Sequence, residues 1–197
     1  MKKVFAIAAA LMMLATAANA QSFGAGYVQS TANSVASNGF YAGFGYSAEI
    51  MPGLNLNPGL YYEFLTNSNG VGGSWVSVSG KTTEHYVNVP LHLSYGINFA
   101  PTFKVFAYGG PTANVGIASN TVTTVSTVVG GGSNNHDNYK DSNYGRFDIM
   151  LGVGAGIEVM KKFRLTVGYD WGMLDRDNSD NHVYKRNRLM AGAAFIF

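Results

Sequence analysis

The feature that most constrains the fold of this chain is a period-two alternation of apolar with small or polar side chains, which recurs along most of its length. In residues 163–173, for example, Phe163 and Leu165 share one parity, and Arg164 and Thr166 share the other. A strand sends alternate side chains to opposite faces, whereas a helix repeats every ~3.6 residues. The split predicts eight strands, at residues 22–30, 40–50, 54–65, 86–97, 104–117, 146–159, 163–173 and 188–197.

The connections between these predicted strands alternate in length. The short turns are residues 51–53, 98–102 and 160–162, and the longer polar loops are residues 31–38, 67–84, 118–145 and 174–186. An even number of strands, with short turns at the end that holds both termini, is typical of outer-membrane barrels. The predicted fold is therefore an all-β, eight-stranded antiparallel up-and-down transmembrane β-barrel. The glycine-rich residues 130–135 are too polar to pack alone, and we expect them to be mobile.

The N-terminal residues have the order of a secretory signal peptide. Two lysines precede an apolar run at residues 4–18, which ends in the small-residue sequence Ala18-Asn19-Ala20. We expect residues 1–20 to be a cleavable signal peptide and residues 21–197 to form a single barrel domain. The apolar run is shorter than the ~20 residues that a membrane-spanning helix needs, and no later segment comes close.

Charge and cysteine content exclude several classes of function. Removing Lys2 and Lys3 from the 13 basic residues leaves 11, against 11 acidic ones, so the mature chain is formally neutral. A neutral chain without a basic cluster gives no electrostatic reason to bind nucleic acid. Because there is no cysteine, neither a disulfide framework nor lipid attachment through a cysteine is possible.

Alternation alone does not show which face points inward, because a soluble lipocalin-like ligand-binding barrel alternates as well. The lumen of an eight-stranded barrel is just wide enough for its own side chains. The apolar parity holds most of the large aliphatic and aromatic residues, whereas the other parity is dominated by glycine, serine, threonine and asparagine. We therefore expect the apolar face to point outward to lipid and the small and polar residues to fill the lumen.

Aromatic residues lie near the ends of the predicted strands, where the girdles of a membrane barrel are found. The upper belt is Phe40, Tyr62, Phe64, Phe147, Tyr169 and Trp171, and the lower belt is Phe23, Phe99, Phe103, Phe163, Phe195 and Phe197. Three prolines lie inside predicted strands, at Pro58, Pro90 and Pro111. A closed barrel has no free edge for them, so we expect bulges or locally lost ladder bonds there.

Charged residues on the lumen parity fall into two groups when the strands are projected through this topology. Each group mixes acidic with basic residues, as buried charges require if they are to be paired. The groups are Glu49, Lys104, Glu158 and Arg164 near the periplasmic mouth, and Glu63, Arg146, Asp148, Asp170 and Arg188 near the outer mouth. We expect two salt-bridge layers that close the lumen to solutes; a selectivity filter or proton path is the rival reading.

No catalytic, cofactor or metal motif stands out. His92 and Ser94 share the lumen parity with Glu63 and Asp170, but a triad needs an accessible serine beside an oxyanion site. A packed lumen offers neither, so we expect no enzyme activity. A calcium-like spacing of Asp175, Asp177, Ser179, Asp180 and His182 lacks the glycine and glutamate of a calcium loop. His136 and Asp137 are interpreted as surface residues.

Two segments resemble a known family. Residues 86–95, Tyr-Val-Asn-Val-Pro-Leu-His-Leu-Ser-Tyr, are similar to the fourth strand of the porin-like outer membrane protein beta-barrel domain family, in which a proline inside this strand is usual. Arg146-Phe147-Asp148 and the glycine-rich residues 152–158 are similar to its sixth strand. The resemblance covers roughly the whole mature chain. It implies fold and location in the outer membrane, and it carries over no catalytic residue.

The C-terminus is similar to the assembly signal of outer-membrane barrels. Gly192 precedes the alternating hydrophobic residues Phe195 and Phe197, and the chain stops on an aromatic; Met190 departs from this signal, which has a polar residue there. The expected partners are outer-membrane lipid, lipopolysaccharide and the barrel assembly machinery.

The sequence thus favours a plugged outer-membrane barrel with a structural or loop-mediated interaction role, although it names no partner for the loops. A narrow porin or transport accessory is the alternative; an outer-membrane lipid-modifying enzyme and a soluble lipocalin-like binder rank lower.

Overall fold

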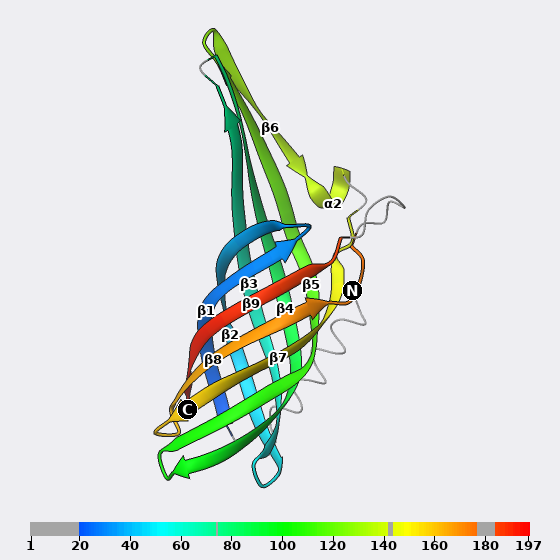
Figure 1. Ribbon diagram of the computed structural model, residues 1–197. Helices are drawn as coiled ribbons and strands as arrows, with labels where there is room; N and C mark the ends of the chain where they lie inside the picture. Colours follow the sequence, from blue (N-terminus) through cyan, green and yellow to red (C-terminus); the bar gives the residue numbers. More distant parts are fainter. Residues whose placement is uncertain (1–19, 74, 142–143, 177–183) are drawn as a thin grey trace.

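The computed structural model describes residues 20–73, 75–141, 144–176 and 184–197 (Figure 1). The signal-peptide prediction for residues 1–20 therefore lies almost entirely outside the described residues. The elements are β1 (Ala20–Ala32), β2 (Val35–Met51), β3 (Leu54–Gly72), β4 (Val76–Ala100), β5 (Phe103–Thr127), β6 (Gly130–Asp137), α2 (Asn138–Asp141), β7 (Phe147–Val159), β8 (Phe163–Gly172) and β9 (Arg186–Ile196). No helix among the described residues is long and apolar enough to cross a membrane.

The described strands form one antiparallel sheet that closes on itself. Its order is β4-β3-β2-β1-β9-β8-β7-β5-β6, and β4 also pairs with β5. The extra pairing closes a ring of eight strands and leaves β6 outside it, paired with β5 alone. Because closure pairs both edges of the ring, every strand within it has two neighbours, as a hydrocarbon environment requires. The predicted eight-stranded up-and-down barrel is confirmed.

The apolar parity faces outward. Val153, Leu165 and Val167 are 48%, 50% and 52% exposed, whereas Asp170 on the opposite parity is fully buried. This orientation is the reverse of a soluble lipocalin, whose apolar side chains line the cavity. A ring of large hydrocarbon side chains with a polar interior needs lipid around it, because contiguous apolar surface of this extent is not stable in water.

Some aromatic residues of each predicted belt contact one another on the outer surface. In the upper belt Phe40 stacks on Phe64 at 5.4 Å, and Tyr169 meets Trp171 edge-on at 5.1 Å between ring centroids. In the lower belt Phe195 meets Phe163 edge-on at 5.6 Å. These contacts connect rings on neighbouring strands or rings two residues apart on one strand. They lie at the levels where amphipathic rings are most stable in a bilayer.

The glycines of the inner face make room for a few aromatic rings that point into the lumen. A Cβ atom on Gly154 or Gly168 would collide with Tyr108, and one on Gly192 would collide with the Tyr41 hydroxyl. The lumen is therefore filled by large rings lying against bare backbone, rather than by many side chains of similar size.

The three short turns are confirmed, but the predicted loop at residues 31–38 is wrong. β1 and β2 are joined by Asn33 and Ser34 alone, both with positive φ, 46° and 64°. Two left-handed residues form the tight hairpin turn that matches the twist of the flanking strands. The turn itself is Asn33-Ser34, which lacks the glycine of the usual Asn-Gly or Asp-Gly signal, whereas the nearby Asn38-Gly39 lies inside β2.

The predicted loops at residues 67–84 and 118–145 are also wrong in large part. β3, β4 and β5 continue far beyond the barrel and, with β6, form a four-stranded sheet that we call the extension: residues 67–72, 76–84, 118–127 and 130–137. It protrudes from the end of the barrel opposite the C-terminus (Figure 1). Residues 130–135, expected to be mobile, pair with β5. The extension is held by cross-strand pairs such as Thr82 with Thr121, whose hydroxyls lie 3.0 Å apart.

The three prolines interrupt the ladder as expected. Pairing between β2 and β3 skips Pro58, pairing between β3 and β4 skips Pro90, and pairing between β4 and β5 skips Pro111. Proline has no N–H to donate, so each one removes a ladder hydrogen bond.

Candidate functional site

The strongest chemical feature of the barrel is a cluster of buried charges across the middle of the lumen, which we call the central layer: Glu63, Asn88, Asp170, Arg186 and Arg188. Arg188 donates through Nη1 to Glu63 Oε2 at 2.5 Å and to Asn88 Oδ1 at 2.7 Å. Its Nε donates to Asp170 Oδ2 at 3.1 Å, and its Nη2 also contacts that oxygen. Arg186 Nη1 donates to Glu63 Oε1 at 3.0 Å.

The strands that carry these residues lie on opposite sides of the ring. Glu63 and Asn88 are on β3 and β4, whereas Asp170 and the two arginines are on β8 and β9; β1 and β2 separate the two pairs of strands on one side, and β5 and β7 on the other. The central layer therefore bridges the lumen from wall to wall. Each of its ionised side chains is at most 2% exposed, and each acid meets an arginine, which is the condition for keeping charge out of water.

The sequence-predicted outer group is divided by the structure. Glu63, Asp170 and Arg188 lie together in the central layer. Asp148 is fully buried nearby, but its Oδ1 accepts from the Leu174 backbone N–H at 3.3 Å and no ion pair joins it to another described residue. Arg146 is exposed and does not point into the lumen: its Nη1 donates to the Ile117 carbonyl at 3.0 Å. Arg146 does not follow the strand alternation because β7 begins one residue after it and parity does not extend beyond a strand.

The sequence-predicted periplasmic group forms a single ion pair. Arg164 Nη2 lies 3.0 Å from Glu158 Oε2, and these residues are direct cross-strand partners on β7 and β8. The pair therefore joins adjacent strands on one wall and does not cross the lumen. Lys104 forms no ion pair among the described residues, and Glu49 is exposed and accepts from the Gly53 backbone N–H at 3.2 Å. The expected second closing layer is wrong because Lys104, Glu158 and Arg164 are cross-strand neighbours on one side of the wall. Glu49 lies on β2, away from these three strands, and forms no ion pair with them among the described residues.

A second cluster, which sequence reasoning missed, covers the outer mouth. We call it the lid: Arg176 with Tyr86, Tyr139, Tyr144 and Tyr184. Arg176 is fully buried; its Nη1 donates to the Tyr86 hydroxyl at 3.0 Å and its guanidinium lies 4.5 Å from the centre of the Tyr144 ring. Tyr144 in turn meets Tyr184 edge-on at 5.1 Å. Cation–π contacts of this kind are strongest when they are desolvated.

The lid is connected to the central layer through Tyr86. The Arg186 guanidinium lies 4.0 Å from the centre of the Tyr86 ring, and the Tyr86 hydroxyl donates to Glu84 Oε1 at 2.8 Å. The lid residues come from β4, from the segment around α2 and from the segments on either side of residues 177–183. The sequence offered one signal for this cluster: Tyr139, Tyr144 and Tyr184 are concentrated in the last two predicted loops, together with Arg176.

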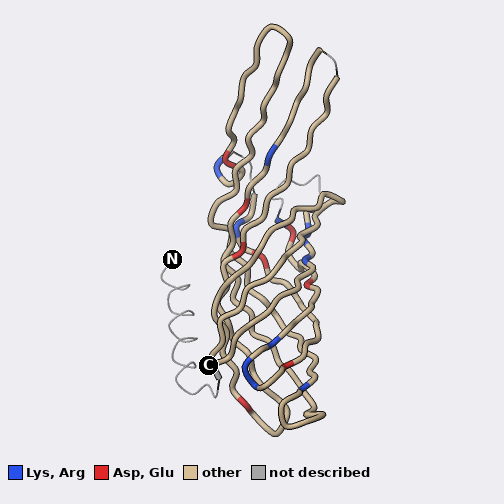
Figure 2. The backbone as a smooth tube through the Cα atoms, turned by 90° about the vertical axis from the view of Figure 1, so that its left-hand side faces the viewer, with Lys and Arg blue, Asp and Glu red and all other residues tan. Residues whose placement is uncertain are grey.

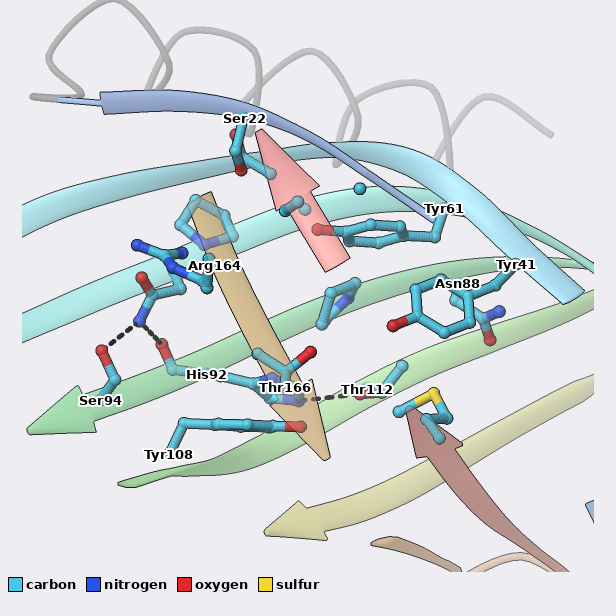
Figure 3. Close-up of a pocket in the computed structure, with 18 of the residues that line it drawn as sticks. Ser22, Tyr41, Tyr61, Asn88, His92, Ser94, Tyr108, Thr112, Arg164 and Thr166 are labelled. Atoms are coloured by element: carbon cyan, nitrogen blue, oxygen red, sulfur yellow. Dashed lines mark hydrogen bonds between the residues drawn. The ribbon is translucent and has the colours of Figure 1, made fainter. Parts of the chain in front are cut away.

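Below the central layer lies a cavity of about 140 Å³, which we call the lumen cavity (Figure 3). Tyr41 and Tyr61 line one side, 5.9 Å apart between ring centroids, and His92 stacks on Tyr108 at 5.3 Å on the other. Arg188 reaches the cavity from above, whereas Arg164 lies at its periplasmic end. Its walls combine aromatic rings with a few hydroxyl and amide groups.

The geometry of His92 and Ser94 is not that of a catalytic pair. His92 Nε2 lies 3.1 Å from Thr112 Oγ1, while Ser94 Oγ accepts from Asn57 Nδ2 at 2.8 Å. No hydrogen bond joins His92 to Ser94 in the part of the chain that the structure describes. Within the same residues, no group of three or more His, Asp or Glu side chains has the geometry to hold a metal ion. The calcium-like pattern falls mostly on residues 177–183, outside those described.

A closed ring that is apolar outside and polar inside defines an integral outer-membrane β-barrel. A family model described as "Outer membrane protein beta-barrel domain" matches residues 13–178, and the chain belongs to that family. No curated protein matches the sequence.

Several solved structures are similar in fold to this chain at low sequence identity. Ail, the attachment invasion locus protein of Yersinia pestis, is 14% identical, with 90% of this chain and 98% of that chain covered and a TM-score of 0.41. Neisserial surface protein A is 14% identical, with 90% and 96% covered and a TM-score of 0.47. The N-terminal β-barrel domain of Pseudomonas aeruginosa OprF is 12% identical, with 89% and 97% covered and a TM-score of 0.33.

Proposed function

We propose that this protein is a closed outer-membrane barrel that holds its extension outside the cell for contact with an apolar surface of a partner. The closure rests on the central layer, because ion pairs that bridge opposite walls leave no continuous water path between them. The position of the extension rests on the topology: the short turns and the C-terminus occupy the other end of the barrel, which is the periplasmic end in proteins of this type.

The observation that carries the proposal is the apolar tip of the extension. Val71, Val78 and Val125 are direct cross-strand partners, so they form a row across three strands on one face. The tip residues of the two hairpins are more exposed still: Trp75 is 77% exposed and Val129 is 98% exposed. A contiguous exposed apolar patch on a part of the protein that lies in water marks an interaction surface.

The rest of the extension is polar and nearly uncharged. The opposite face carries pairs such as Ser77 with Ser126 and Ser79 with Thr124. Figure 2 shows that charged residues gather in the barrel and at its outer mouth, whereas the two hairpins above them carry few. In the extension, the outer edges of β3 and β6 have no strand partner among the described residues, so their backbone groups are open to a further strand. This chemistry favours an apolar or β-edge partner over a polyanion.

The proposal also covers export and assembly. Residues 1–20 would direct secretion, and Gly192, Phe195 and Phe197 would form the signal read by the barrel assembly machinery. Support comes from the position of these residues: Phe195 is exposed on the outer face of β9, Phe197 is exposed directly after the end of this strand, and Gly192 packs against Tyr41 inside. Lipopolysaccharide is the expected neighbour of the outer end of the barrel.

Adhesion of intact cells tests the role of the tip. Cells that display the native chain should adhere to polystyrene more strongly than to glass, and Trp75→Ser with Val129→Ser should lower adhesion to polystyrene about tenfold or more, since burial of each large apolar side chain contributes on the order of 1.5–3 kcal/mol. The matched control is Ser77→Ala with Ser126→Ala on the polar face, which should adhere like the native chain at equal surface amounts.

Equal adhesion of the tip variant and the control would refute the proposed role of the tip. The rival function, a narrow porin, is tested separately by planar-bilayer recording of the purified native protein. A closed barrel gives no steady ion current, whereas a steady large conductance would establish an open lumen.

A further inference from the structure

The barrel wall contains a diagonal line of interrupted strand pairing, which we call the proline seam. Between β2 and β3 the pairing passes from Gly45–Gly59 directly to Ala48–Leu56. Between β3 and β4 it passes from Pro58–Leu91 to Tyr61–Asn88, and between β4 and β5 from Pro90–Thr112 to Leu93–Gly109. The pairs that the register would place in these gaps are Tyr46–Pro58, Ser47–Asn57, Gly59–Pro90, Leu60–Val89, Leu91–Pro111 and His92–Gly110.

Each interruption contains one of the three prolines, so the seam has a chemical cause. A proline has no N–H to donate to the ladder, so it is found where strand pairing is locally lost. The seam crosses three neighbouring interfaces one after another, whereas the pairing of β5 with β7 is continuous from Phe103 to Val115. One half of the wall is therefore held by fewer hydrogen bonds than the other half at the same height.

The seam lies against the lumen cavity. Asn57, Gly59, Pro90 and His92 line the cavity, as do Tyr46 and Pro58. Tyr46 and Pro58 lie on the lipid-facing parity of their strands, because the residues beside them, Gly45 and Gly59, lie on the lumen parity. The cavity therefore extends into the wall at the place where β2 and β3 are unpaired.

We propose that the lumen cavity is a binding site for a small, mainly apolar molecule of the size of one six-membered ring, which passes between the cavity and the membrane through the proline seam. A cavity of about 140 Å³ has room for one such ring, since an apolar cavity of ~150 Å³ binds benzene. The central layer closes the route from the outer mouth, and the seam is the weakest part of the wall beside the cavity.

The side chains of the cavity specify the ligand more closely. The rings of Tyr41, Tyr61 and Tyr108 offer faces and edges for an aromatic molecule. His92 and Thr112, joined at 3.1 Å, are at hand for one hydroxyl or amine on that ring. A phenol-like ligand fits this combination, whereas an ion or a sugar would leave most of the lining rings without a partner.

Binding is tested with 4-fluorophenol and the mature full-length protein in lipid nanodiscs, followed by ¹⁹F NMR against protein-free nanodiscs. Ala194 lines the cavity, so Ala194→Leu should fill part of it and weaken saturable binding about tenfold or more. The matched control is Ala191→Leu, an exposed position on the lipid side of the same strand, which should bind like the native protein. Non-saturable signal that is equal in all three proteins would overturn the site.

The route is tested by locking the seam. The chain has no cysteine, so Leu60→Cys with Val89→Cys introduces a single possible disulfide across the unpaired part of β3 and β4. Oxidation should slow exchange of 4-fluorophenol about tenfold or more, and reduction should restore it, because a closed wall removes the open state. Ala155→Cys with Val167→Cys, which crosslinks paired residues of β7 and β8, should leave exchange unchanged.

The two experiments separate the two parts of the proposal. Saturable binding that is lost in Ala194→Leu supports the binding site. Exchange that is slowed by the seam disulfide alone supports the route through the proline seam. Saturable binding with exchange that the seam disulfide does not affect would overturn the membrane route and place the entrance at the periplasmic end. Adhesion and conductance play no part in either readout, so the outcome is independent of the function proposed for the extension.

Discussion

The central layer and the Glu158–Arg164 pair are both ion pairs on the lumen face, yet they differ in burial and in what they join. In the central layer the side chains are at most 2% exposed, and Glu63 receives hydrogen bonds from two arginines and Asn88. The periplasmic pair has one bond, its side chains are 20% and 14% exposed, and it links neighbouring strands. The first crosses the barrel; the second lies along its wall.

The difference shows that the contribution of a charged lumen side chain to stability depends on how many partners it bridges, and not on how many charges lie near it. A buried carboxylate with three donors fixes the distance between opposite walls, and removing it leaves Arg186 without a counterion and Arg188 with one of its two. A pair near the rim is partly solvated, so water replaces the lost partner at little cost.

The largest effect should follow from removal of the Glu63 carboxylate. Glu63→Met leaves Arg186 unpaired and Arg188 with Asp170 alone, so the free energy of unfolding should fall by about 3–5 kcal/mol. Urea unfolding of the protein in liposomes, followed by tryptophan fluorescence, measures it. In Glu63→Met with Arg186→Met the loss should be smaller, because the unpaired charge is removed as well. A loss below about 1 kcal/mol in the single variant, the range of surface pairs, would contradict the comparison.

A much smaller effect should follow from the same change of charge at the rim. Glu158→Gln keeps the shape of the side chain and should lower the free energy of unfolding by less than about 1 kcal/mol. Because partly solvated pairs are screened by salt, the difference from the native protein should vanish near 1 M salt, where the Debye length is about 3 Å. Unfolding at low and high salt, with Glu63→Met measured beside it, gives the contrast: the central layer should keep most of its effect in salt.

The sequence predicted much of the barrel because the lipid face and the lumen face differ at nearly every residue. It placed Glu63, Asp170 and Arg188 near one another from parity and topology alone. Arg186 was missed although it shares the parity of Arg188, because the predicted strand began two residues too late. Arg146 was placed in the lumen because the predicted strand began one residue too early.

The extension was missed for a different physical reason. Outside the membrane both faces of its strands meet water, so burial imposes no sustained period-two pattern, and alternation is confined to short stretches such as residues 76–79. Its order comes from cross-strand hydroxyl and valine pairs whose partners are far apart in the chain, such as Val78 with Val71 and Val125. A single strand of this kind has the composition of a polar loop, and only the pairing shows that it is a sheet.

The smallest of these effects on stability is expected at the lid. Its tyrosines are uncharged at neutral pH and therefore form no ion pair there. Burial raises the pKa of Tyr144 and the pKa of Tyr184 above the ordinary value of 10.0. In the unfolded chain both phenols ionise near pH 10, whereas in the folded protein they stay protonated to higher pH. The stability that they contribute is therefore fully present below pH 10 and is lost as the pH rises from there toward the folded pKa values.

Docking of the lid should accordingly not change between pH 7 and pH 10 and should weaken above pH 10. Absorbance at 295 nm should show a group of tyrosines, Tyr144 and Tyr184 among them, that ionise later than the rest, and limited proteolysis at the outer mouth should begin when these two ionise. Tyr144→Phe should remove one of the late tyrosines and shift the onset of proteolysis to higher pH. If all tyrosines of the variant and the native protein ionise together near pH 10, the lid is open to water and Arg176 does not hold it closed.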